Sequence, residues 1–443
     1  MLWNFSKRFQ FAADRLIPEP FVFCIILTLI IFILGLILTD SGPLSLIIYW
    51  YDGLWSMISF AFQMSFLVIC CGAAARAPQI ERALNRLAQF PKSSQFAMFL
   101  LLFFGFVSSL ISWAFSLVLT PIFAMYLSKH VKGLHFPIMI AAGCSTMILG
   151  HCWCPSATVY ALLASKGHFM ESTIGVLSQD VTTYNPVNTM LFFILVTITI
   201  LLGVFTRPPV DEVIIYQGDF TEPAASVEEL YITPAEKMNN SEMLMMILGV
   251  AGLIYIIHSF LTIGIIKSLD FNFIILFFLT INFFLYNTPH KFVAAFKRSI
   301  TLATEIMLQF PFYGGIMHMM SGSGLTNLFA IGLVEVATVK TMPLFSFWAS
   351  SFVNLFVPSQ GGQWIVLGPV LVKAAHSLNV DLPLVINAFV YGDEATLIQP
   401  LYIIPALSLV GMKLKEVWGF LAFIWFVWFI VTSIGLLVLP SLI

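Results

Sequence analysis

Residues 354–364 read NLFVPSQGGQW, and they interrupt an apolar stretch that runs from 343 to 374. Proline, glycine and serine in the middle break the helical hydrogen-bond ladder. Each half holds roughly 12–15 residues, which is too short to cross a bilayer that needs about 20. Non-helical backbone at membrane depth is tolerated only where it is buried in protein or lines a cavity. The stretch therefore predicts a re-entrant helical hairpin.

A second interrupted stretch, residues 94–129, predicts another hairpin. Three serines interrupt the apolar run near its middle: Ser108, Ser109 and Ser112. Each hairpin is followed by a long segment with polar residues near its centre, at 136–165 and at 382–410. We interpret both of these segments as broken helices.

The composition places these features in a membrane protein. Of 443 residues, 59% are hydrophobic and 9% are charged, with a mean hydropathy of +0.96. A soluble domain carries roughly 25% charged residues. The net charge of −2 also leaves no basic footprint for nucleic acid. These values exclude a cytosolic enzyme, a nucleic-acid-binding protein and a disordered chain, and they predict an all-α polytopic membrane protein.

Several other stretches are long and apolar enough to be spans. We expect crossings at about 21–39, 53–75, 188–206, 243–263, 271–288, 301–320 and 418–439.

An internal repeat follows from one constant offset of 246 between the two halves. Gln63 falls on Gln309 and Ser108 falls on Asn354, and the order span, amphipathic helix, hairpin, broken helix and span recurs. We assign residues 1–206 to the first repeat and 264–443 to the second. Each repeat crosses an even number of times and the connecting span adds one crossing, so the second repeat is expected to be inverted. The hydrophilic segment 207–242 is the linker, followed by the connecting span 243–263.

The positive-inside rule sets the orientation. With a cytoplasmic N-terminus, all but four of the 20 Lys and Arg residues lie on the inner side. We therefore expect a multi-pass protein of the bacterial cytoplasmic (inner) membrane with an external C-terminus.

Two neighbouring acids, Asp393 and Glu394, lie deep in the second broken helix. A charge at the bilayer centre costs roughly 2.5–3.5 kcal/mol, so such residues mark ion pathways. Both are candidates for coupling to a proton or another cation, and His151 is a candidate proton carrier. The structural alternative is a carboxylate that caps the broken helix or pairs with His151. The adjacent Cys152 and Cys154 lack a second ligand pair, so we expect no metal site.

The hairpin tips supply the candidate substrate site. Backbone N–H groups at the start of the helix after Ser359 suit a carboxylate, because the positive end of the helix dipole points at it. The alternative is a kink that only lets short helices pack, and serines also serve close packing. Gln63 and Gln309 bind either substrate or a neighbouring helix. The candidate substrate-binding residues are Gln63, Ser108, Ser109, Ser112, Gln309, Asn354, Ser359, Gln360, Gly361, Gly362, Gln363 and Thr396.

Residues 354–364 resemble the signature of the bacterial short-chain fatty acid transporter (AtoE) family, within the ion-transporter superfamily. Residues 309–317, QFPFYGGIM, are also similar, as is Gly392-Asp393 with Thr396, Gln399 and Pro400. The resemblance covers essentially the whole chain. It implies uptake of small monocarboxylates such as acetoacetate and butyrate, a scaffold with a moving transport domain, and a homodimer. Residues 152–156, CWCPS, depart from the Gly/Ser-rich run of the family.

The sequence therefore predicts a secondary transporter for short-chain monocarboxylates. We expect elevator-type alternating access, coupling to protons or sodium ions, and no other cofactor. A related carrier for dicarboxylates or other small organic anions is the nearest alternative. A channel would have an open pore lined by repeated rings of residues, and a single asymmetric site argues against this class. A membrane enzyme needs a nucleophile–base or metal constellation, which the central residues lack.

Overall fold

The computed structural model describes residues 20–206, 213–216, 233–355, 357, 359–398, 403, 406–407 and 410–442. Within these ranges the chain is helical and contains no β-strand, which confirms the all-α class for this part of the chain. Some predicted features lie outside the described residues. They are the N-terminal segment 1–19, most of the linker 207–242, and Pro358, Gln399 and Pro400 of the motifs.

The first half of the chain contains ten helices within the described residues. Prolines begin several of them, where the missing N–H is harmless. Their bounds are α2 (Pro20–Leu38), α3 (Pro43–Ser56), α4 (Ile58–Ala75), α5 (Pro78–Leu87), α6 (Ser94–Ile111), α7 (Trp113–His130), α8 (Phe136–Gly150), α9 (Thr158–Leu163), α10 (Glu171–Ile174) and α11 (Pro186–Phe205).

The second half continues after a short helix in the linker. Short 3-10 turns, written η, join several of its α-helices. The bounds are α12 (Pro234–Asn239), α13 (Glu242–Thr262), η2 (Ile266–Ser268), α14 (Phe271–Tyr286), α15 (Pro289–Ser299), η3 (Ile300–Ala303), α16 (Thr304–Ser323), α17 (Leu325–Val336), α18 (Met342–Asn354), α19 (Gln360–Leu378), α20 (Leu382–Tyr391), η4 (Gly392–Leu397), α22 (Leu414–Val438) and η5 (Leu439–Ser441).

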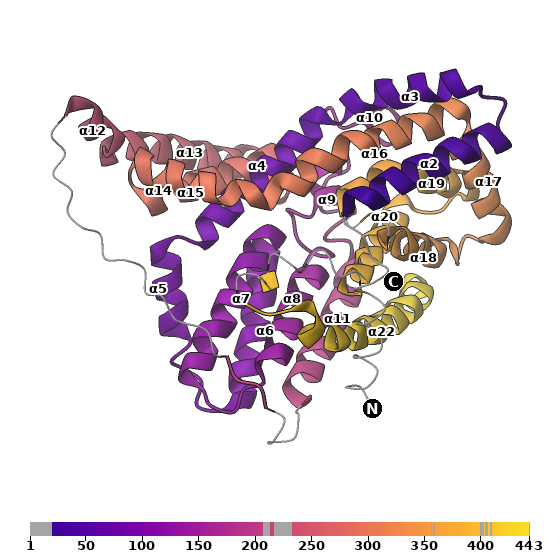
Figure 1. Ribbon diagram of the computed structural model, residues 1–443. Coiled ribbons are helices and arrows are strands. Elements are labelled where there is room, and N and C mark those ends of the chain that lie inside the picture. Colours follow the sequence, from indigo (N-terminus) through magenta and orange to yellow (C-terminus); the bar gives the residue numbers. More distant parts are fainter. Residues whose placement is uncertain are drawn as a thin grey trace.

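One group of helices forms a long layer. The rod from α15 through η3 and α16 lies beside α2, α3 and α4, and α13 and α14 extend the layer at the other end (Figure 1). Glycines allow the closest approach, since a Cβ added to Gly315 would lie 2.6 Å from the Trp50 ring on α3. The rod then bends by 78° into α17. Gly324 provides the bend with a φ of +89°.

A second group of helices packs beneath this layer. The helices α6, α7 and α8 contact one another, and α11 and α22 lie along them. Figure 1 places α18 and α20 on the other side of α22, where η4 joins α18, α8 and α22. The candidate site residues gather where these elements end.

Within the described ranges, five helices are long and apolar enough to cross a membrane, and the bent pair α15–α16 with α17 would be a sixth. They match the predicted spans 188–206, 243–263 and 418–439, and the bent pair contains 301–320. The predicted span 53–75 is divided at Met57, so only Ile58–Ala75 forms the candidate span. The apolar helices at the remaining two predicted spans, Cys24–Leu38 and Phe271–Tyr286, are shorter. The first hairpin's α6 is itself long enough to span.

The expected length of the hairpin halves is wrong for three of the four helices. Helices α6 and α7 have 18 residues each, and α19 has 19, whereas α18 has 13. The serines at 108 and 109 do not break α6, because each hydroxyl donates to a carbonyl three residues earlier. The chain breaks only at Ser112, whose backbone is extended.

Candidate substrate and ion site

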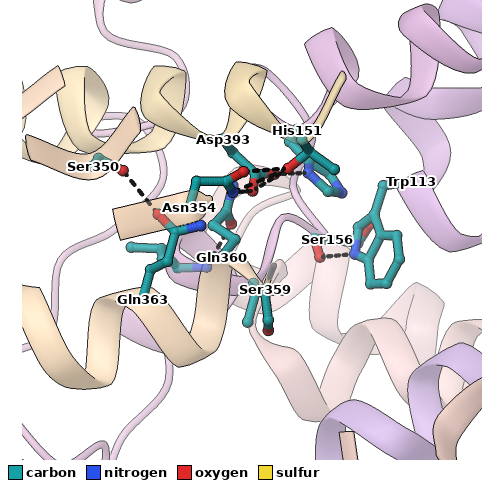
Figure 2. Close-up of polar contacts among 12 residues, drawn as sticks. Trp113, His151, Ser156, Ser350, Asn354, Ser359, Gln360, Gln363 and Asp393 are labelled. Carbon is teal, nitrogen blue, oxygen red and sulfur yellow. Dashed lines mark hydrogen bonds and ion pairs between the residues drawn. The ribbon is translucent and has the colours of Figure 1, made fainter. Parts of the chain in front are cut away.

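Four polar side chains from three elements meet at one point, and Asp393 lies at its centre. Its Oδ2 lies 2.6 Å from Nδ1 of His151, and its Oδ1 accepts hydrogen bonds from Nδ2 of Asn354 at 3.0 Å and the Thr396 hydroxyl at 3.2 Å. Asn354 also donates to the Thr396 hydroxyl oxygen at 3.0 Å. Figure 2 shows the side chains of Asn354 and His151 on either side of Asp393. This set forms the centre of the site.

The local sequence explains why these groups meet. His151 caps the end of α8, Asn354 is the last residue of α18, and Asp393 lies in the η4 turn directly after α20. Gly392 lets η4 approach α18, because a Cβ there would clash with Ser350. Three chain breaks therefore bring polar side chains to one buried point, where His151 and Asp393 are each 4% exposed.

The hydrogen bonds of Asp393 and His151 are consistent with one arrangement of protons. An ionised carboxylate only accepts, and both Asp393 oxygens have donors, which fits an ionised side chain. His151 then carries a proton on Nδ1 and directs it at Asp393. The other ring nitrogen, Nε2, is buried and has no hydrogen-bond partner among the described residues. One edge of the imidazole packs against the Trp113 ring, with centroids 5.0 Å apart.

The start of α19 adds donors beside this centre. The Ser359 hydroxyl caps the helix and accepts from the Gly362 N–H at 3.3 Å. Gln360 accepts from the Val159 N–H at 3.2 Å, and Gln363 accepts from the Ser350 hydroxyl at 3.0 Å. The side-chain NH₂ groups of both glutamines are buried and unpartnered within the described structure.

Two glycines allow the start of α19 to pack closely against other elements. A Cβ on Gly361 would lie 2.8 Å from the Thr158 methyl and 3.2 Å from the Phe310 ring, and one on Gly362 would lie 2.6 Å from the Tyr313 ring. The Tyr313 hydroxyl donates to Gln309 at 2.8 Å. Gln309 therefore supports the tip through Tyr313, and it also bonds Glu305 on its own helix.

The serines of the first hairpin satisfy one another and their own backbone. Ser108 donates to the Gly105 carbonyl and lies 3.0 Å from the Ser116 hydroxyl. Ser109 donates to the Phe106 carbonyl at 2.7 Å. The Ser112 hydroxyl lies 3.3 Å from Sγ of Cys71 on α4. The structure does not bring these three hydroxyls into the hydrogen bonds of the Asp393 centre.

Two other candidate residues also point elsewhere. Glu394 accepts from the Thr432 hydroxyl of α22 at 2.9 Å, and its second oxygen is buried without a described partner. Gln63 donates to Asn272 of α14 at 2.8 Å, which matches the neighbouring-helix alternative for this residue.

Residues outside the predicted set complete the site. Trp113 packs on His151, and its ring N–H donates to the Ser156 carbonyl at 3.2 Å. Ser350 joins Gln363 to the Phe389 carbonyl. The sequence signal for Trp113 is its position directly after the hairpin break. Ser350 carries no such signal, because serines are common in these helices.

Charge at the site is mainly negative. Among the described residues, Lys and Arg are absent from the hydrogen-bond and ion-pair partners of Asp393, Glu394 and His151. No group of three His, Cys, Asp or Glu side chains suitable for a metal occurs in the described part of the chain. The geometry can hold a proton on the imidazole and can offer amide N–H groups to a small anion.

Helices of spanning length around a buried polar centre define the class, a multi-pass membrane protein, and a solved structure has a similar fold. That structure, the YdaH transporter of Alcanivorax borkumensis, has a TM-score of 0.55 and 13% identity, with 96% of this chain and 99% of that one covered. The family described as "Short chain fatty acid transporter" matches residues 1–439, and the chain belongs to this family.

Two curated relatives carry the same family name over nearly their whole length. A protein of Escherichia coli (strain K12) is 30% identical over 430 residues, covering 95% of this chain and 96% of the relative. A protein of Haemophilus influenzae (strain ATCC 51907 / DSM 11121 / KW20 / Rd) is 29% identical over 432 residues, again covering 95% and 96%. Each is named "Putative short-chain fatty acid transporter".

Proposed function

We propose that the protein is a secondary active transporter that moves short-chain monocarboxylates, such as acetoacetate and butyrate, across the cytoplasmic membrane. Family membership supports the substrate class. The single observation that carries the site assignment is the buried contact of Asp393 with His151, Asn354 and Thr396 beside unpartnered amide donors. A proton or sodium gradient supplies the energy.

In this proposal the substrate carboxylate binds at the start of α19. The free NH₂ groups of Gln360 and Gln363 are its side-chain donors, and the helix dipole adds favourable potential. Neutral amide donors without an arginine suit an anion that must be released again. The coupling cation then binds at the Asp393 centre.

We also propose two inverted repeats and elevator-type movement. The offset of 246 recurs between helix starts that are far apart in sequence: α3 begins at Pro43 and α15 at Pro289, while α4 begins at Ile58 and α16 at Thr304. Helices α8 and α20, which begin at Phe136 and Leu382, keep the same spacing. In this proposal the long layer is the scaffold, the remaining helices move against it, the N-terminus is cytoplasmic, and two chains form a homodimer.

Uptake into proteoliposomes tests the function. Labelled butyrate and acetoacetate are supplied under an inward proton gradient, an inward sodium gradient or no gradient, with protein-free vesicles to subtract passive entry of the acids. We expect accumulation that requires one gradient and is inhibited by unlabelled monocarboxylates. Gradient-driven uptake of labelled succinate, with no uptake of either monocarboxylate, contradicts the substrate class and favours a dicarboxylate carrier.

A further inference from the structure

The unused atom at the site is Nε2 of His151. The side chain is 4% exposed, and its other nitrogen is engaged by Asp393 at 2.6 Å. A buried ring nitrogen without a partner is costly unless another group occupies its position during function. Histidine is the side chain that most often carries a proton in transport and catalysis, because the ordinary charge change of imidazole falls between about pH 5 and pH 8.

The negative charges around the His151 ring disfavour the binding of an anion that brings no proton with it. From η4 come Asp393, in contact with the ring, and Glu394, bonded to Thr432. The other titratable groups nearby are thiols and phenols: Cys152 and Cys154 after α8, Tyr160 on α9 and Tyr391 on α20.

The remaining charges on the helices that pack against α8 lie at distant ends. Lys129 and His130 end α7, whereas Trp113, which touches His151, begins it, and the helix of 18 residues is about 27 Å long. Glu416 lies in the first turn of α22, four turns before Thr432. Helices α6 and α11 carry no charged residue.

We propose that His151, held by Asp393, takes up one proton together with each monocarboxylate that binds, so that acid and proton cross the membrane as a neutral pair. This inference rests on the proposed function and adds the coupling ion, its carrier and the stoichiometry. Asp393 is the positioning residue, and Nε2 of His151 is the proton-carrying atom.

The charge balance explains the requirement. With a neutral imidazole, the pair carries one negative charge, and an incoming carboxylate would place a second one in a buried site. A proton from the aqueous phase that binds Nε2 makes the pair neutral and creates an N–H donor for the carboxylate. On the other side the carboxylate leaves and Nε2 releases the proton to water, so the site returns to its starting state.

Proton uptake on binding tests this directly. The purified full-length protein is titrated with butyrate near pH 7.5 by calorimetry in two buffers of different ionisation enthalpy, which gives the protons bound per acid. We expect about one proton per butyrate for the wild type. In vesicles, a membrane potential imposed without a pH gradient should leave butyrate uptake unchanged.

Variants locate the proton. His151→Asn keeps an amide near the Nδ1 position and His151→Gln near the Nε2 position, and neither titrates. We expect proton uptake to fall to nearly zero in whichever variant folds, and butyrate affinity to fall at least about tenfold. His168→Gln is the matched control, because His168 is also buried but both its ring nitrogens have backbone partners.

The outcomes separate the two levels of the proposal. Butyrate binding by the wild type without proton uptake overturns this inference and leaves the transporter standing. One proton per acid in a folded His151 variant also overturns it, since the proton then travels on the acid itself. Absence of both binding and uptake for either acid overturns the proposed function and this inference together.

Discussion

The two helical hairpins share a shape and differ in chemistry. In α6–α7 the break is a single residue, Ser112, and the nearby hydroxyls bond to their own backbone, to one another or to a thiol. In α18–α19 the break carries amides that bond across to other elements, from Gln360 to Val159 and from Asn354 to Asp393. Unpartnered amide groups remain only at the second tip among the residues compared here.

The difference teaches that two residues matched by the proposed repeat have different roles. Ser108 and Asn354 stand at the same place in their hairpins by the offset of 246. The serine closes its hairpin on itself, whereas the asparagine reaches η4. We infer that the first hairpin is a packing element that presents Trp113 to His151, and that the second hairpin carries the binding chemistry.

The largest expected effect comes from Asp393→Asn. Removing the charge frees His151 from its anchor, so we expect gradient-driven accumulation of butyrate to fall by about 100-fold or more, a loss of roughly 2.7 kcal/mol. Proteoliposome uptake measures it. The matched control is Asp381→Asn before α20, whose side chain makes no capping hydrogen bond. Equal losses in both variants would contradict a special role for Asp393.

The next largest effect is expected from a substitution of Gly361 at the tip of the α18–α19 hairpin. In Gly361→Ala the added methyl meets Thr158 and Phe310 at 2.8 and 3.2 Å, and overpacking of this kind costs about 1–3 kcal/mol. We expect butyrate uptake to fall about tenfold. Gly332→Ala on α17 has open space around its Cβ and should transport normally. Normal uptake by the Gly361 variant would show that the tip tolerates separation from α16.

The first hairpin should respond through stability. Gly150→Ala places a methyl against the Ser109 side chain, so we expect the protein to unfold at a temperature several degrees lower. The double variant Gly150→Ala with Ser109→Gly removes the clash and should recover most of that loss. The measurement is thermal unfolding in detergent. Reduced butyrate affinity in the recovered double variant would place Ser109 in the binding site after all.

Much of this arrangement was readable from the sequence. The interruption at 354–364, the helix starts after prolines and the buried acids at 393 and 394 each have a local pattern. The pairing of His151 with Asp393 joins residues 242 positions apart, and the sequence left it only as an alternative. Local periodicity cannot rank such contacts, because it fixes which residues share a helix and not which helix ends meet.

The hairpin lengths show the same limit at short range. Polar residues near position 108 predict an early break in the helix. The hydroxyls of Ser108 and Ser109 bond to their own helix instead, so α6 continues to Ile111. Asp393 and Glu394 are neighbours in the sequence, yet Glu394 bonds Thr432 whereas Asp393 bonds His151. In each case the deciding partner lies in three-dimensional structure rather than in the neighbouring sequence.

The smallest expected effect is at Gln63. Its bond to Asn272 is at an exposed position, so Gln63→Ala should change the free energy of unfolding by no more than about 0.5 kcal/mol and leave uptake unchanged. Thermal unfolding and butyrate uptake check both. A tenfold loss of uptake would return Gln63 to the substrate site.

The most direct test of the unequal hairpins compares Asn354→Ala with Ser108→Ala in the same butyrate uptake assay. Asn354 holds Asp393 and Thr396 in place, so we expect its variant to lose about tenfold or more in uptake rate, a change of about 1.4 kcal/mol. The Ser108 variant should stay within about twofold, because both hydrogen bonds that it loses lie within its own hairpin. Equal losses, or a larger loss at Ser108, would contradict the placement of the binding chemistry at the second hairpin.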